Sequence, residues 1–266
     1  MALAHAVRFG GAVRRTALAV AAIACWANLG MMVYLADGTS KADLGPGGMF
    51  LPLCRSAFPS FTILVCGFLI ILIRRSSYLC SGAVAMGLWL LDFVVRHRGC
   101  EHSHLLTMDV LFTYSIVGLL CGGPSAERTA WEACCAMIGA VYTLAGLSKL
   151  KSSGLYWINA EYLRLLVTSG SIQSAGAIHA IRIALGHSPL FAFAASAYTL
   201  LVELCGFTML RRSWRPYYTT ALLPLHFGFF LGMGIFWPQQ IILVAALGLP
   251  LESLYLRFFR ATPMVK

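Results

Sequence analysis

The sequence predicts an all-α fold: a polytopic transmembrane helical bundle of about eight spans, forming one membrane domain over residues 1–266 without a separate soluble domain. Three observations predict it. Of 266 residues, 59% are apolar and 11% charged, whereas a soluble domain is about 45–50% apolar and about 25% charged. The mean hydropathy is +0.78. The apolar residues also gather in stretches of about 20, the length that crosses a hydrocarbon core. Too few charged groups remain to cover a soluble fold of this size.

The apolar stretches are separated by turn-forming and basic residues. Arg14 and Arg15 precede the first stretch, which we interpret as a retained anchor because it is too long for a signal peptide and lacks a small-residue cleavage pattern. Glycine and proline at 45–48 and 122–124 break the chain after the first and fourth stretches. The expected spans are 17–36, 57–73, 78–95, 105–122, 129–147, 188–209, 217–236 and 240–258.

Region 150–187, between the fifth and sixth spans, does not have the composition of a span. It contains amphipathic pieces separated by glycine and serine, and Tyr156 and Trp157 are residue types that favour the headgroup level. We therefore expect interfacial amphipathic helices here, on the outer side of the membrane.

The distribution of basic residues predicts the orientation. With the N-terminus in the cytoplasm, twelve of the 20 Lys and Arg fall on the inner side and eight on the outer side, which favours this arrangement. We expect both termini to be cytoplasmic, in the inner (plasma) membrane of a bacterium. The formal charge of +10 then reflects residues that flank spans. Because no basic cluster is interleaved with aromatics, nucleic acid is not an expected partner, and the lipid bilayer is.

The nine cysteines lie mostly in apolar runs, where cysteine behaves as a small hydrophobe. No Cys-x-x-Cys motif occurs. Cys54 and Cys100 lie in predicted loops, and a disulfide between them stays an open alternative.

Ionisable side chains within predicted spans are functional candidates, because they are costly in a bilayer. Glu203 lies in mid-span, so it is expected to be protonated or paired with Lys149 or His226. Lys149, at the outer end of the fifth span, either extends its ammonium to the headgroups or is partly buried and serves as a general base. The embedded ionisable residues are Asp92, Asp109, Glu132, Lys149, Glu203 and His226.

A second polar group lies in the loop before the fourth span. His97, Cys100, His102 and His104 fall within eight residues, and imidazole and thiolate are common ligands of transition metals. The alternative interpretation is a polar outer loop with helix-capping residues. A metal-dependent membrane oxidoreductase using these four residues is therefore one alternative function.

Several motifs resemble the HTTM family, which includes the membrane domain of vitamin K-dependent gamma-carboxylase. The resemblance begins with residues 142–150, which read Tyr-Thr-Leu-Ala-Gly-Leu-Ser-Lys-Leu, and continues with the Tyr-Trp-Ile-Asn-Ala-Glu-Tyr-Leu run at 156–163. The family has a lysine pair in the first motif, and its second lysine is the catalytic base. That lysine matches Lys149, whereas Ser148 replaces the first lysine and Lys151 remains nearby.

Two further stretches extend the resemblance over about residues 85–250. The run 101–105, Glu-His-Ser-His-Leu, is similar to the family's Asn-His-Ser-Tyr-Leu, which places an important histidine on His102. The run from Leu225 resembles the family's Phe-His run ending in Gly-Met-Phe, which places a second important histidine on His226.

The resemblance implies an integral membrane enzyme that uses a lipid-soluble hydroquinone, such as reduced vitamin K or menaquinone, together with oxygen and in some reactions carbon dioxide. It implies quinone epoxidation that generates a strong base, with Lys149 as general base and His102 and His226 at the quinone oxygens. A metal cofactor is not expected. The expected substrate- and quinone-binding residues are Trp157, Glu203, Tyr142, Lys151 and His104.

One departure from the family concerns the C-terminus. The carboxylase carries a large lumenal C-terminal domain, whereas this sequence ends at Lys266, shortly after the last predicted span. We therefore expect a small-molecule or peptide substrate, or a separate partner protein. An accessory membrane protein for maturation or export of a secreted peptide is an alternative function. A transporter is the least favoured class, because no inverted repeat is evident.

Overall fold

Every element of the protein is helical in the residues that the computed structural model describes, which are 2–35, 50–95, 105–159, 161, 163–165, 167, 176–233 and 238–259. This confirms the all-α class. Five of these helices are long and apolar enough to cross a membrane, or up to six if one bent pair forms a single span. This number is below the eight that the sequence predicted.

The chain divides into two compact units. Unit 1 comprises residues 1–134 and 238–266, and unit 2 comprises residues 135–237. The helix α5 (Ala126–Ser153) contributes its first turns to unit 1 and the rest to unit 2.

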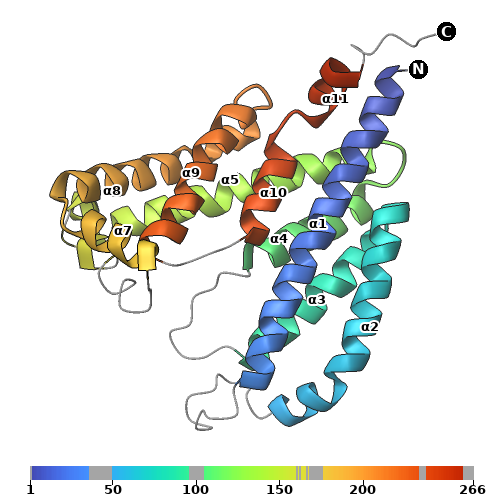
Figure 1. Ribbon diagram of the computed structural model, residues 1–266. Helices are drawn as coiled ribbons and strands as arrows, with labels where there is room; N and C mark the ends of the chain where they lie inside the picture. Colours follow the sequence, from blue (N-terminus) through green and yellow to red (C-terminus); the bar gives the residue numbers. More distant parts are fainter. Residues whose placement is uncertain are drawn as a thin grey trace. The chain divides into compact units, whose positions relative to one another are not determined.

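Unit 1 is organised around its first helix. The helix α1 packs against α2, α3, α10 and α11, and α3 packs against α4 (Figure 1). Small side chains such as Ala19, Ala22 and Cys25 are fully buried on α1, and small residues let neighbouring helices approach closely in membrane bundles. The helices of unit 1 are α1 (Ala2–Leu35), α2 (Leu51–Arg75), α3 (Tyr78–Val95), α4 (Leu105–Cys121), α10 (Pro238–Gly248) and α11 (Leu251–Phe259).

Two adjacent arginines of α1 connect it to other helices. Arg14 donates to both carboxylate oxygens of Glu252 in α11, at 2.6 and 3.0 Å. Arg15 pairs with Glu127 at the start of α5 and donates to the carbonyl of Ile73 near the end of α2 at 3.1 Å. These residues, predicted only as flanking charges, therefore hold four helices together at one end of unit 1.

The helix boundaries correct several predicted spans. The predicted span 240–258 is broken into α10 and α11, which meet at 71°. The break falls at Pro250, and proline disfavours helix at the residue before it and cannot donate a backbone hydrogen bond. The helix α1 begins at Ala2 rather than near residue 17, and α5 continues to Ser153 rather than ending near 147. The span 78–95 coincides with α3.

Unit 2 contains the end of α5 followed by shorter elements. Ser188 caps α8 by accepting a hydrogen bond from the backbone of Phe191 at 3.3 Å, with Pro189 at the first helical position. The helix α9 continues through Pro224. The further elements are η3 (Gly154–Ile158), α7 (Gly176–Gly186), α8 (Pro189–Leu204), η4 (Cys205–Leu210) and α9 (Arg215–Met233).

The short helix α7 is attached to α9 by a buried arginine. Most of α7 is exposed, including Ile178 and Ile181, but Arg182 is only 5% exposed. Its guanidinium donates to the carbonyls of Leu231 at 2.8 Å and Phe230 at 3.1 Å, near the end of α9. A cation is favoured there by the helix dipole. Helices therefore exist between α5 and α8, as predicted, and their location in the plane of the membrane stays a prediction.

Candidate acid–base site

An ion pair in unit 2 joins the two charges that the sequence expected to meet. Nζ of Lys149, on α5, lies 2.6 Å from both carboxylate oxygens of Glu203, on α8. The Glu203 side chain is 6% exposed and that of Lys149 is 23% exposed. The prediction that Glu203 pairs with Lys149 or His226 is thus confirmed for Lys149.

Glycines on α5 allow this pair to form. A Cβ at Gly146 would lie 2.9 Å from the backbone nitrogen of Leu204 and 3.1 Å from Cβ of Glu203. A Cβ at Gly139, two turns earlier, would lie 2.6 Å from the carbonyl oxygen of Gly206. One face of α5 therefore lies directly against the backbone of α8 and η4. Lys149 follows Gly146 by three residues, which places it on the same face.

The helix dipoles do not favour Glu203 at its position. It lies in the last turn of α8, where a carboxylate faces the negative end of the helix dipole. Lys149 lies near the C-terminal end of α5, where a cation is favoured. The carboxylate is thus stabilised by Lys149 rather than by its own helix.

An aromatic ring forms a further contact with the ammonium. Nζ of Lys149 lies 5.2 Å from the ring centroid of Trp157 in η3, within the range of a cation–π interaction. Gly154, at the start of η3, has φ of +57°, a conformation that glycine adopts without steric cost. The chain thereby turns sharply after α5 and places Trp157 beside a lysine in that helix.

A second buried pair lies two turns earlier on α5. The hydroxyl of Tyr142 lies 2.5 Å from Nε2 of His226, on α9. Tyr142 is 7% exposed and His226 3% exposed. Tyr142 precedes Lys149 by seven residues, so the two pairs lie on the same face of α5, about 10 Å apart along its axis.

Two adjacent residues of α9 carry further buried hydroxyl groups, and one of them lies near this second pair. The ring of Tyr218 lies 6.5 Å from that of Tyr142, nearly perpendicular to it. The hydroxyls of Tyr218 and Thr219 are buried and have no hydrogen-bond partner among the residues that the structure describes. A buried hydroxyl without a partner costs about 1–3 kcal/mol, so these groups are candidates for contact with a bound molecule.

This arrangement suits proton transfer. In surroundings of low polarity, a lysine–carboxylate pair can pass a proton from the ammonium to the carboxylate, because burial disfavours both charges. The product is a neutral amine beside a neutral acid, with no change in net charge. The pair can thus supply a base, while the phenol and the imidazole can donate and accept hydrogen bonds.

The structure locates some of the predicted site residues and not others. It brings together Lys149, Glu203 and Trp157, and it joins Tyr142 to His226. Lys151 is exposed in the last turn of α5. Cys54 is a free thiol in the described part of the chain. The other candidates, His97, Cys100, His102 and His104, lie outside the described residues, and so do the metal site and the disulfide that depend on them.

Some parts of the site were not predicted. The sequence suggested neither the Tyr142–His226 contact nor the role of Gly146. Two spacings in the sequence are consistent with these features. Gly139 and Gly146 are seven residues apart, so they lie on one face of α5, and Tyr218 lies about two turns before His226 on α9.

Comparison of the chain with protein-family models, with curated proteins and with solved structures finds no match. The HTTM resemblance therefore stays a prediction that depends on the motifs around Lys149, His102 and His226.

Proposed function

We propose that this chain is an integral membrane enzyme of the HTTM type that uses a lipid-soluble hydroquinone and oxygen, with Lys149 as its general base. The observation that carries the proposal is the pair of a partly buried Lys149 with a buried Glu203. Charged side chains in membrane proteins are costly and mark functional positions. Because a buried ion pair can be replaced by apolar residues with little loss of stability, folding alone does not require one.

In the proposed reaction, a proton first moves from Lys149 to Glu203 and leaves a neutral amine. The amine then takes the proton of a hydroquinone hydroxyl, so one proton passes from the substrate to the pair and no electron moves in this step. The hydroquinone supplies the redox chemistry, since its reaction with oxygen yields the quinone epoxide and water. In the family that the motifs resemble, this chemistry drives carboxylation; here a small or peptide substrate would be modified.

The polar groups two turns from the ion pair along α5 can hydrogen-bond to a quinone. Tyr142 and His226 provide a buried phenol and imidazole, and Tyr218 provides a hydroxyl whose hydrogen-bonding capacity is not used by the described residues. Quinone oxygens accept hydrogen bonds and hydroquinone hydroxyls also donate them. Trp157 offers a ring face, and an apolar setting excludes water from a reactive base.

The proposal includes eight spans with both termini in the cytoplasm and the site on the outer side. The helix α4 has 17 residues and α9 has 19, which corresponds to about 26 and 28 Å at 1.5 Å per residue, close to the hydrocarbon thickness of about 30 Å. In this arrangement α10 and α11 together form one broken span.

This topology can be tested with two exposed serines, one just before α5 and one at its last residue. In the proposed orientation, Ser153→Cys reacts with a membrane-impermeant maleimide in intact cells, whereas Ser125→Cys reacts only after permeabilisation. Each would be introduced in a background without other accessible cysteines. The reverse labelling pattern would contradict the orientation.

The enzymatic proposal is tested with purified protein in lipid nanodiscs, supplied with reduced menaquinone or vitamin K and oxygen. The measurement is formation of the quinone epoxide by liquid chromatography. Lys149→Arg keeps the cation beside Glu203 but removes a base that can lose its proton, so epoxide formation should be abolished. Glu161→Gln, a matched change in an exposed ion pair with Arg164, should leave turnover unchanged. Absence of epoxide from the unchanged protein would contradict the proposal and favour an accessory role.

A further inference from the structure

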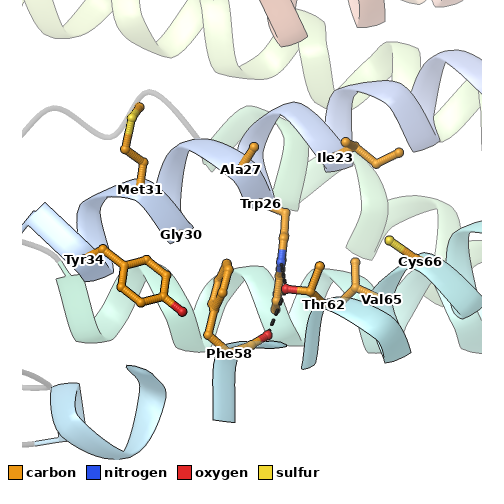
Figure 2. Close-up of a pocket in the computed structure, with 10 residues that line it drawn as sticks. All are labelled: Ile23, Trp26, Ala27, Gly30, Met31, Tyr34, Phe58, Thr62, Val65 and Cys66. Atoms are coloured by element: carbon orange, nitrogen blue, oxygen red, sulfur yellow. Dashed lines mark hydrogen bonds between the residues drawn. The ribbon is translucent and has the colours of Figure 1, made fainter. Parts of the chain in front are cut away.

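A concave apolar pocket lies between α1 and α2 in unit 1 (Figure 2). Its volume is about 450 Å³, within the range of about 300–1,000 Å³ that is usual for small-molecule sites. Trp26 and Tyr34 of α1 and Phe58 of α2 form much of its wall. The pocket is thus large enough for a ligand and is lined mainly by aromatic and aliphatic groups.

The indole N–H of Trp26 and the hydroxyl of Thr62, both in the pocket wall, are already hydrogen-bonded. Nε1 of Trp26 donates to the hydroxyl of Thr62 at 2.9 Å, and that hydroxyl donates to the carbonyl of Phe58 at 2.8 Å (Figure 2). A polar ligand group placed here would lose its bonds to water without replacement, which is unfavourable. The interior therefore suits a hydrocarbon chain.

The pocket opens on an exposed apolar flank. In the most apolar 18-residue stretch of α2 only 17% is buried, whereas 56% of the corresponding stretch of α1 is buried. The exposed side chains of α2 include Ile63 and Leu64. Ala27 and Cys66, which line the pocket, are also exposed. For two helices long and apolar enough to cross a membrane, lipid is the surrounding medium, so acyl chains can enter the pocket from the side.

The shape of the wall favours a slender chain over another helix. Helix–helix contacts in membranes use small residues that allow close approach, but Gly30, the glycine of the pocket wall, is already covered by the Phe58 ring. That ring stacks on Trp26 at 5.5 Å and meets Tyr34 edge-on at 5.7 Å. The three rings therefore line the hollow, and the backbone at Gly30 is not open to a second helix.

A cation lies at the Tyr34 end of the pocket. Nε of Arg55 donates to the carbonyl of Val33 at 2.8 Å, and Val33 directly precedes Tyr34. Guanidinium groups near membrane boundaries attract lipid phosphates. We propose that the pocket binds one acyl chain of a bilayer phospholipid, with the phosphate at the Arg55 end. This binding site is independent of the chemistry at Lys149.

The experiment uses the full chain in nanodiscs that contain a trace of phosphatidylglycerol with a diazirine near the end of one acyl chain. After irradiation, mass spectrometry locates the cross-linked residues. Labelling should concentrate on the lining residues of α1 and α2. Ala27→Phe fills the pocket and should lower this labelling about tenfold, because it takes the volume otherwise occupied by lipid methylenes. Ala27→Leu, a smaller change, should give an intermediate decrease.

The matched control is Ala83→Phe, at an exposed alanine of α3 outside the pocket, which should leave the labelling unchanged. Equal labelling of α1, α2 and the outer face of α3 would overturn the proposal, as would labelling that Ala27→Phe does not reduce. Competition by excess menaquinone but not by unlabelled phospholipid would assign the pocket to an isoprenoid chain and overturn it. A protein–protein cross-link at the same residues, in place of lipid, would also overturn it.

Discussion

Lys149 and Glu203 are separated by 54 residues in the sequence, yet Nζ of the lysine contacts both carboxylate oxygens of the glutamate at 2.6 Å. Three features of unit 2 produce this contact. Gly146 brings α5 against the backbone of α8, the last turn of α8 presents the carboxylate, and the ring of Trp157 lies 5.2 Å from the ammonium. The packing of α5, α8 and η3 therefore positions the two side chains of the pair.

The first prediction concerns loss of one partner. Glu203→Ala leaves the Lys149 ammonium in a partly buried position without its carboxylate, and removing one member of a buried pair costs about 3–5 kcal/mol. We expect the free energy of unfolding in mixed micelles to fall by at least about 3 kcal/mol. Glu161→Gln, in an exposed pair, should change it by less than about 1 kcal/mol. Similar losses in the two variants would contradict the importance of burial.

The second prediction compares two buried tyrosines. Tyr142→Phe removes the hydroxyl that bonds to Nε2 of His226 and should lower stability by about 1–3 kcal/mol. Tyr218→Phe removes a buried hydroxyl that has no hydrogen-bond partner in the described ranges, so it should leave stability unchanged or raise it. If that hydroxyl binds the hydroquinone, the same variant raises KM. A destabilisation by Tyr218→Phe as large as that by Tyr142→Phe would show that this account of the two hydroxyls is wrong.

The third prediction concerns the approach of α5 to α8. Gly146→Ala would place a Cβ 2.9 Å from a backbone nitrogen, and such overpacking typically costs about 1–3 kcal/mol. Because the helices must separate, Lys149 and Glu203 also lose their geometry, and turnover should fall with stability. Gly228→Ala on α9, where nothing lies within 4 Å, should stabilise the helix by about 0.5–1 kcal/mol. Chemical denaturation and turnover assays of both variants provide the test; an unchanged Gly146→Ala protein would argue against a tight contact.

The fourth prediction addresses the attachment of α7. Arg182→Ala removes charge-assisted hydrogen bonds to the carbonyls of Leu231 and Phe230, each worth about 1.5–3 kcal/mol. We expect faster amide hydrogen exchange in α7 and at the end of α9. Ile181→Ala, at an exposed neighbouring position, should leave amide hydrogen exchange in both helices at the rate of the unchanged protein. Equal exchange in both variants would mean that Arg182 does not hold the two helices together.

The all-α class and the Lys149–Glu203 pairing could be predicted because both depend on composition. With 11% charged residues, an embedded carboxylate has few cations available, so Lys149 was one of two expected partners. The span 78–95 was also predicted correctly, since its apolar stretch ends at basic and polar residues.

The close approach at Gly146 and the break at Pro250 were not predicted from the sequence. A glycine within an apolar stretch does not reveal which neighbour will pack against it, and proline inside a helix is sometimes accommodated. Indeed α9 continues through Pro224, whereas α10 and α11 meet at 71° beside Pro250. Neighbouring helices decide between these outcomes, and their positions are tertiary information.

The central claim is that the Lys149–Glu203 pair exists for chemistry and is not needed for folding. The most direct test is the double variant Lys149→Met/Glu203→Met, measured for both unfolding and hydroquinone-dependent epoxide formation. Because apolar replacement of a buried ion pair is often neutral or stabilising by about 1–4 kcal/mol, the variant should be at least as stable as the unchanged protein and should form no epoxide. A double variant that still forms epoxide at the rate of the unchanged protein would contradict the claim.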